Sequence, residues 1–270
     1  VLHVVNCNTG LEISPTKGPR HPQANINYNQ MVRGLDIHIG EGNAGAIGVR
    51  MQAAEGSSIQ DMTIDATHGH TGMQGAAGSG GSHHQITVIG GRVGIDTRGW
   101  PPQYAEGGPG TQPGPTMSRV TLIGQSETPA IIYSTGPFTA VAWHVIRSRP
   151  GAAILALNAT GQYNVSQVNL IDSRIEFEQV SERNVVLEGS QGATIRNTFA
   201  NRASVVHGDL KGNASGWTRV AEYACPGSDT QFKGKKAIYA IEQPVFLDGV
   251  KQKTPFVFTI ASQEPPADLI

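Results

Sequence analysis

Cysteine, aromatic residues and charge are all scarce in this chain. Only 2 of the 270 residues are Cys, aromatic residues make up 6% and charged residues 15%, a composition that favours a solenoid over two small globular domains. The formal net charge is −1 at pH 7. Neutralising phosphates requires a basic face, so we expect neither nucleic acid nor an anionic membrane as a partner.

Long apolar runs are also missing. The longest, near 152–157, is far shorter than the roughly 18–20 residues that cross a bilayer, so no membrane-spanning segment is predicted. The first five residues, VLHVV, show no charged-then-apolar signal pattern. We therefore predict no signal peptide in the chain as given, although we expect a secreted or cell-surface protein.

Glycine and short β-rich runs are abundant instead. Gly supplies 34 of 270 residues, above the average of roughly 7%, which indicates many tight turns. The apolar centres of the β-rich runs recur about every 25 residues, with one longer step in the middle of the series. These centres are Ile37, Ile64, Val88, Leu122, Val145, Leu170 and Ile195.

A period of 20–50 residues indicates a solenoid, a propeller or an array, and no helix-length amphipathic segment supplies a helical unit. We predict an all-β fold: a right-handed, single-stranded parallel β-helix over 1–201, with coils of about 25 residues stacked ~4.8 Å apart. An irregular C-terminal cap or linker, 202–270, is expected to hold a β-hairpin around Asp248-Gly249. Cys7 and Cys225 lie near opposite ends of such a solenoid, so both are predicted to be free thiols.

The one long step, from Val88 to Leu122, carries a Pro/Gly-rich insertion between Gly99 and Thr116. Insertions on one face of a solenoid commonly border its binding surface, so Trp100 and Tyr104 are candidates for stacking on a sugar ring. The alternative is a Pro/Gly loop that carries two incidental aromatic residues.

Two neighbouring coils repeat a pattern, Met51-Gln52 and Met73-Gln74, each followed by small residues. Gln52 follows Ile37 by the same number of positions as Ser79 follows Ile64. Equal offsets predict that the Gln52 and Ser79 side chains are about one coil rise apart, ~4.8 Å, where they could hold a water or a sugar hydroxyl. The alternative is a polar stack that only solvates the solenoid.

These segments carry a family resemblance: GVRMQAAEGSSIQDMTI at 48–64, GMQGAAGSGG at 72–81 and GGRVGI at 90–95. Over roughly 35–150 the chain resembles the first β-helix of glycoside hydrolase family 55, which comprises β-1,3-glucanases with a pectate-lyase-like fold. The resemblance implies that Gln52 and Ser79 position the hydrolytic water. It also implies a general acid on a second β-helix, which we do not predict within this chain.

Hydrolysis of a glycoside normally needs two carboxyl groups, and the coils show no stacked carboxylate pair. Glu41, Glu55 and Glu106 are candidate acids by position, and His70 and Glu106 are candidate substrate contacts. A zinc site is disfavoured, because the adjacent residues His83 and His84 would point to opposite faces of a strand. No metal and no cofactor are predicted.

The sequence thus predicts a carbohydrate-active protein that hydrolyses, or contributes to hydrolysis of, a β-1,3-glucan-type polysaccharide, as a glycoside hydrolase of the glucan β-1,3-glucosidase type. The expected partners are a polysaccharide or oligosaccharide and a second β-helix domain or chain. Two alternatives stay open. One is a non-catalytic glycan-binding or structural β-helix, such as half of a larger enzyme or a fibre segment. The other is a polysaccharide lyase for acidic glycans, with guanidinium groups from Arg147 and Arg149.

Overall fold

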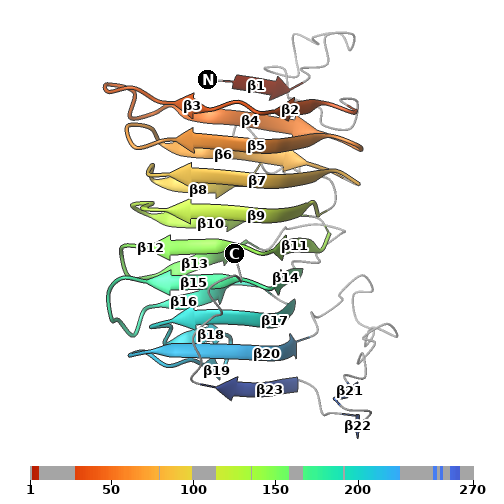
Figure 1. Cartoon of the computed structure of the whole chain (residues 1–270), viewed down its shortest axis with the longest axis vertical. Coiled ribbons are helices and arrows are strands. Elements are labelled where there is room, and N and C mark those ends of the chain that lie inside the picture. Colours follow the sequence, from red (N-terminus) through yellow and green to blue (C-terminus); the bar gives the residue numbers. More distant parts are fainter. Residues whose placement is uncertain are drawn as a thin grey trace, which may run out of the picture.

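The computed structural model of the chain describes residues 28–78, 80–98, 114–134, 136–157, 167–190 and 192–225, and the backbone of strands at 2–5, 246–247, 250–251 and 256–261. This part of the chain forms two large sheets of mostly parallel strands, wound as a parallel β-helix (Figure 1). The predicted all-β fold class is confirmed. Within the same ranges no helix is long and apolar enough to cross a membrane. Cys7 lies outside the described residues, so its state as a thiol stays a prediction.

The first sheet has nine strands. In spatial order they are β1 (Leu2–Val5), β4 (Ile47–Ala53), β6 (Thr71–Ala77), β8 (Val93–Asp96), β10 (Thr128–Ile132), β13 (Ala152–Ala156), β16 (Val185–Glu188), β18 (Val205–His207) and β19 (Leu210–Lys211). All neighbours are parallel except β18 and β19, which are antiparallel. One inward-facing residue from each of six strands forms a fully or almost fully buried column: Val49, Met73, Ile95, Ala130, Ile154 and Leu187.

The second sheet has twelve strands. They are β2 (Met31–Arg33), β3 (Ile37–His38), β5 (Ser58–Asp65), β7 (Ser82–Ile89), β9 (Thr116–Ile123), β11 (Phe138–Val141), β12 (His144–Arg147), β14 (Gln167–Ile171), β15 (Arg174–Phe177), β17 (Gly192–Asn201), β20 (Trp217–Cys225) and β23 (Phe256–Ala261). The last two close the solenoid, because β20 pairs antiparallel with β17, and β23 with β20. A separate pair, β21 (Phe246–Leu247) and β22 (Val250–Lys251), is antiparallel.

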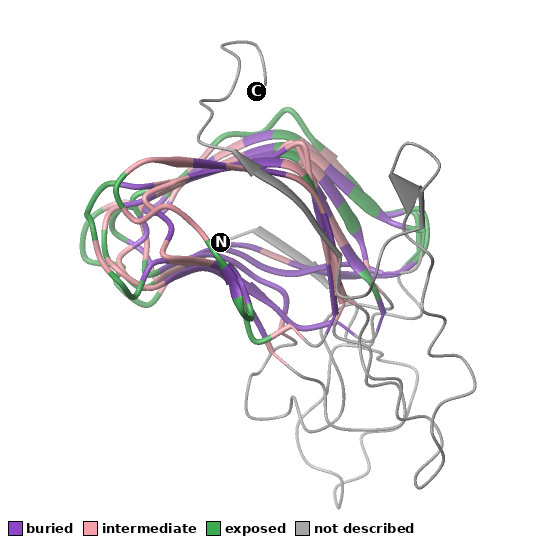
Figure 2. Ribbon diagram, turned by 90° about the horizontal axis from the view of Figure 1, so that it is seen from below, coloured by how far each residue is buried: buried purple, intermediate pink, exposed green. Residues whose placement is uncertain are grey.

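The core lies between the two sheets, where the buried segments line the interior (Figure 2). Its main column on the twelve-stranded sheet runs through the predicted centres Ile37, Ile64, Val88, Leu122 and Val145, which confirms their common register. The last four are fully buried.

The regular spacing of the seven centres predicts that all of them share one core column, and for the last two centres this prediction is wrong. Val145 aligns with Ile175 and then with Ala200, so the main column continues through these two residues. Leu170 and Ile195 align with each other and with Ala140, in a second column on the first half of the sheet.

A one-residue bend separates these two columns in each coil from Gly34 to Asn197 that the structure describes. The residue at the bend has a positive φ, between 43° and 66°, in Gly34, Asp61, Gln85, Arg119, Ala142, Asp172 and Asn197. Left-handed backbone is unfavourable for residues with a Cβ, so neighbouring coils must hold it in place. Side chains at the bend help: Gln85 Nε2 donates to Asp61 Oδ1 at 3.2 Å, and Asn197 Nδ2 donates to Asp172 Oδ1 at 2.9 Å.

Candidate functional site

The outer face of the nine-stranded sheet carries the predicted site residue Gln52. Side chains alternate along a strand, so the residue after each member of the buried column points away from the core. The register aligns six such residues on neighbouring strands, which we call the outer row: Arg50, Gln74, Asp96, Ile131, Leu155 and Glu188. With strands ~4.8 Å apart, the row is about 24 Å long.

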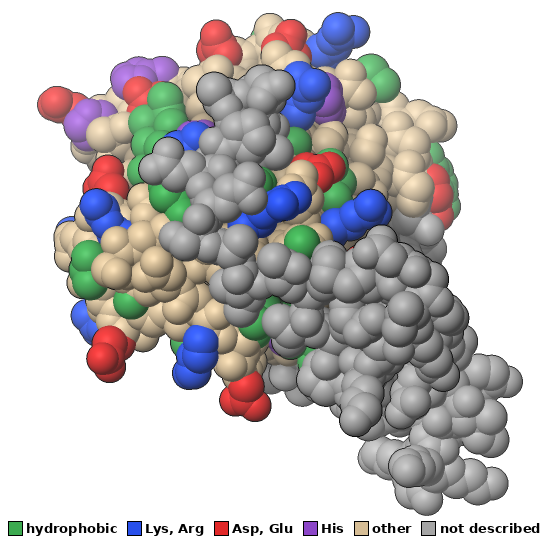
Figure 3. Space-filling view, turned by 60° about the horizontal axis from the view of Figure 1, so that its bottom comes forward, with side chains coloured by type: hydrophobic (Ala, Val, Ile, Leu, Met, Phe, Trp, Pro, Cys, Tyr) green, Lys and Arg blue, Asp and Glu red, His purple; other side chains and the backbone are tan. Residues whose placement is uncertain are grey.

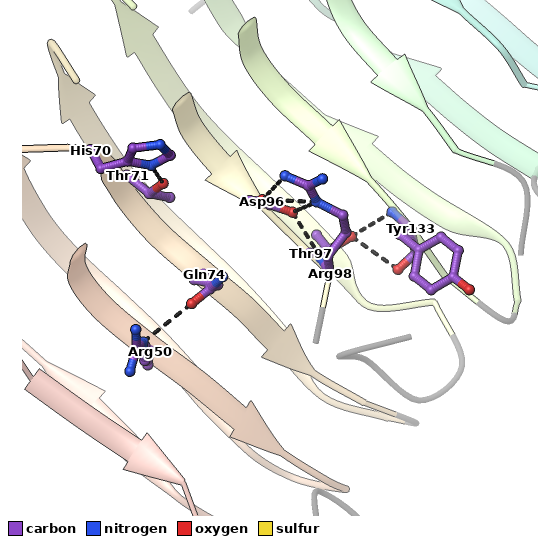
Figure 4. A network of polar contacts seen from close by, with 8 residues as sticks. All are labelled: Arg50, His70, Thr71, Gln74, Asp96, Thr97, Arg98 and Tyr133. Atoms are coloured by element: carbon purple, nitrogen blue, oxygen red, sulfur yellow. Dashed lines mark hydrogen bonds and ion pairs between the residues drawn. The ribbon is translucent and has the colours of Figure 1, made fainter. Parts of the chain in front are cut away.

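Two polar members of the outer row are enclosed although they face away from the core. Gln74 is 5% exposed and Asp96 is 3% exposed, and Gln52, on the same strand as Arg50, is 5% exposed. Burying polar groups costs free energy unless they form hydrogen bonds. This end of the row therefore has to be held by specific contacts, most of which Figure 4 shows.

Arg50 and Gln74 are joined across β4 and β6. Arg50 Nε donates to Gln74 Oε1 at 3.2 Å. Partial burial lowers the pKa of the Arg50 guanidinium from its ordinary value. The pair places a cation and an amide side by side at the polar end of the outer row.

Asp96 is bound on both carboxylate oxygens by Arg98. Arg98 Nε lies 2.9 Å from Oδ1 and 3.0 Å from Oδ2, Nη2 lies 2.6 Å from Oδ2, and the Arg98 backbone N–H also donates to Oδ1 at 3.0 Å. These bonds raise the pKa of Arg98 and outweigh the opposing effect of burial. Charge-assisted bidentate pairs are among the strongest polar contacts, so Asp96 is fixed in one orientation.

The strand ends beyond Asp96 are tied together by Thr97. Its Oγ1 donates to the Tyr133 carbonyl at 3.0 Å and accepts from the Tyr133 backbone N–H at 2.6 Å. Thr97 is fully buried. This reciprocal contact joins the ends of β8 and β10, and so fixes Asp96 relative to Ile131, its neighbour in the row.

Gln52 lies on the predicted face, but its neighbour differs from the predicted one. It aligns with Ala76 rather than with Ser79, so the equal-offset count is wrong for this sheet. The count used the step from Ile37 to Ile64 on the other sheet, which is longer than the step from Gln52 to Ala76. Ser79 lies outside the described residues, and its pairing with Gln52 stays a prediction.

The other predicted substrate contacts are spread out or undescribed. His70 is half-buried just before β6, where Nδ1 lies 2.8 Å from Thr71 Oγ1. Trp100, Tyr104 and Glu106 lie outside the described residues.

The remaining candidates identified by position have separate surroundings. Glu41 and Glu55 are exposed in turns. His83 is fully buried, whereas His84 is on the outer face with Nδ1 2.8 Å from Ser118 Oγ, so the two adjacent rings do point apart. Sequence reasoning missed Arg50, Asp96 and Arg98. Only the repeated Met-Gln pattern pointed toward Gln74.

A second polar cluster lies on the outer face of the twelve-stranded sheet. Glu176 Oε1 lies 2.9 Å from His144 Nε2 and accepts from Arg174 Nε at 2.7 Å. The hydrogen bond with His144, more than that with Arg174, lowers the pKa of Glu176 to about 2 against the opposing effect of burial. Arg174 also stacks on the Trp217 ring, 5.2 Å from its centroid.

Comparisons with known proteins identify no relative of this chain. Protein-family models, curated proteins and solved structures were each searched, and none matches the chain significantly. The class of protein that the fold defines is therefore the parallel β-helix. The resemblance to glycoside hydrolase family 55 stays an interpretation of the sequence.

Proposed function

We propose that the chain is a carbohydrate-active β-helix protein that binds a β-1,3-glucan-type polysaccharide along the outer row. The observation that carries this proposal is the composition of the row: hydrogen-bonding groups at one end, of which Arg50 is half-buried, and the apolar side chains of Ile131 and Leu155 further along, of which Leu155 is half-buried. Sugar rings present hydroxyl edges and C–H faces, so one ring can use both kinds of contact. A row of about 24 Å suits an extended chain of sugars.

The charge distribution favours a neutral ligand. The net charge is −1, and acidic and basic side chains are interspersed over the twelve-stranded side and C-terminal end of the molecule seen in Figure 3, which lie away from the outer row. A polyanion is normally attracted by a surface of one sign. A neutral glycan needs no such field, and it can bind through amides and guanidinium donors such as Gln74 and Arg50.

For hydrolysis, we propose that Gln52 and Ser79 orient the water and that a second β-helix domain or chain supplies the general acid. Glycosidases need two suitably spaced carboxyl groups. The row neighbours of Asp96 are Gln74 and Ile131, neither of them acidic, and both Asp96 oxygens are bound by Arg98. The isolated chain should then bind glucan and release little product.

A non-catalytic glycan-binding β-helix is the second candidate function. The contact between Asp96 and Arg98 favours this function. Arg98 binds both oxygens of the Asp96 carboxylate, so this carboxylate is a hydrogen-bond acceptor with a structural role. The lyase alternative loses one of its two guanidinium groups: Arg147 lies on the inner side of its strand, so it does not face a substrate.

The test is titration calorimetry of the full chain with a soluble β-1,3-glucan. Replacing Gln74 with Ala should raise Kd about tenfold, the equivalent of a lost hydrogen bond. Asn169→Ala, on the outer face of the other sheet, is the matched control and should leave Kd unchanged. No binding by the native chain, or equal losses in both variants, would contradict the proposal. Release of reducing sugar by the isolated chain would favour catalysis over binding alone.

A further inference from the structure

Three polar side chains are enclosed at the corner where each coil passes from the twelve-stranded to the nine-stranded sheet. Gln125 and Asn184 are fully buried, and Arg147 is 5% exposed. Gln125 and Asn184 belong to the connections between β9 and β10 and between β15 and β16, and Arg147 is the last residue of β12. We call this group of three the inner corner.

The three residues come from consecutive coils that touch at this corner. The Gly124 backbone N–H donates to the Ile146 carbonyl at 3.3 Å, which places the turn of Gln125 against the strand end that carries Arg147. The Val185 N–H donates to the Gly151 carbonyl at 3.3 Å, which places Asn184 against the turn that follows Arg147. Arg147 is therefore between the coils of the two amides.

The amide of Gln125 has a fixed orientation. Its Nε2 lies 3.1 Å from the Val88 carbonyl, 3.1 Å from the Gly90 carbonyl and 3.0 Å from the Ile123 carbonyl. Three acceptors around one atom require it to be the NH₂ group. Oε1 is then a buried acceptor, and it has no hydrogen-bond partner among the described residues.

The amide of Asn184 has a fixed orientation for the same reason. Its Nδ2 donates to the Gln179 carbonyl at 2.7 Å and to the Arg202 carbonyl at 3.0 Å. Its Oδ1 is a second buried acceptor with no partner in the described part of the chain.

Arg147 supplies the complementary donors. Its Nη2 donates to the Pro150 carbonyl at 3.2 Å, whereas Nε and Nη1 are buried and have no partner within the described ranges. The guanidinium lies directly on Gly151, where a Cβ would be 2.5 Å from Nη2. Burial lowers the pKa of this guanidinium.

A buried polar atom that forms no hydrogen bond destabilises the folded state, so four of them at one corner call for a ligand. We propose that the inner corner is a binding site for water, in which at least one ordered molecule accepts a hydrogen bond from Arg147 and donates to the amide oxygen of Gln125 or Asn184. Buried waters typically form about three such bonds. This site is independent of glycan binding.

The two fixed amides decide between water and an anion. A halide could accept from Nε and Nη1 and balance the guanidinium charge. If it also contacted an amide oxygen, it would face the negative end of a carbonyl dipole, to which it cannot donate. Water accepts from the guanidinium and donates to the amide oxygens, so it satisfies both kinds of group.

A crystal structure of the full chain at near-atomic resolution tests this site, with one crystal soaked in sodium bromide. Density within hydrogen-bonding distance of Arg147 Nε or Nη1 and of an amide oxygen, without anomalous bromide signal, supports the proposal. A bromide peak at Arg147 would overturn it in favour of an anion. Direct hydrogen bonds from the guanidinium to Gln125 or Asn184, with no density between them, would also overturn it.

A double-mutant cycle gives an independent readout in solution. Gln125→Met and Arg147→Met should be coupled, with the double variant's unfolding constant about tenfold smaller than the product of the single effects predicts. Arg202→Met is the control: this half-buried arginine donates to the Phe177 and Glu178 carbonyls, and its effect should be additive with Gln125→Met. Additivity in both cycles would contradict a shared water.

Discussion

His83 should make the protein sensitive to mild acid. Its ring is fully buried between the sheets, where the Ile59 backbone N–H approaches Nδ1 at 3.0 Å and the Ala77 N–H approaches Nε2 at 2.8 Å. A neutral imidazole accepts at one ring nitrogen only, and the protonated ring has donors at both. Protonation would therefore set two donors against two backbone donors in an apolar surrounding. Burial lowers the pKa of His83 to about 3.

The difference between the pKa of His83 in the folded and in the unfolded chain determines how the free energy of unfolding changes with pH. The ordinary pKa of His is about 6.5, so the unfolded chain binds the proton first as the pH falls. The stability contributed by neutral His83 is complete above pH 6.5 and is lost progressively as the pH falls toward 3. Each unit is worth about 1.4 kcal/mol, so the loss between pH 6.5 and 4.5 is about 2.7 kcal/mol.

Urea unfolding followed by circular dichroism at pH 7.5, 5.5 and 4.5 measures this loss. His83→Met should be destabilised by about 1–3 kcal/mol at pH 7.5, because either the Ile59 or the Ala77 N–H loses the ring nitrogen that accepts from it. It should also lose about 2.7 kcal/mol less than the native chain on going to pH 4.5. His68→Gln, at an exposed turn position, is the control and should keep the native pH dependence. Equal acid losses in the native chain and His83→Met would refute the reasoning.

Three further changes test the core, the row and the second cluster. Leu122→Asp should prevent cooperative folding, because an unpaired buried carboxylate costs several kcal/mol or more; a native melting curve would contradict the core assignment. Gly75→Ala should destabilise the protein by about 1–3 kcal/mol in urea titrations, since Gly75 has a φ of 78° and an added Cβ would meet the Met51 carbonyl. Glu176→Gln should cost about 1–2 kcal/mol at pH 7, allowing for solvent screening. Because the pKa of Glu176 is lowered to about 2, that contribution is present above its ordinary range near 4.5 and is lost as the pH falls toward 2, so the variant should show a flatter acid limb in the same assay.

The core column was predictable at Ile64, Val88 and Leu122, each of which lies after the bend in one continuous strand. It was not predictable after Val145, because the next coil has two short strands, β14 and β15, on either side of Asp172. Leu170 and Ile175 are both central apolar residues of such strands, and the regular spacing of the earlier centres pointed to the wrong one. The deciding feature is the backbone conformation at Asp172, which has no strong sequence signal.

The candidate site was predictable only as a face. Gln52 was found through a repeated pattern, but the outer row depends on the register of the nine-stranded sheet. The connection from Gln74 to Asp96 is a short one, whereas the connection from Asp96 to Ile131 contains the Pro/Gly-rich insertion. Because these connections differ in length, no single repeat length aligns the residues of the outer row. Asp96 and Glu188 therefore could not be related to Arg50 by counting along the sequence.

The bend at Asp61, Gln85 and Arg119 has a consequence for redesign. The connections between the two sheets differ in length from coil to coil, whereas the bend is a single residue each time. The strand segments before and after the bend both pair with the neighbouring coils. An inserted residue there would shift every side chain beyond it to the opposite face of its strand. Foreign loops should consequently be grafted at the corners between the two sheets. The bend should be left unchanged, because it determines the cross-section of the coils.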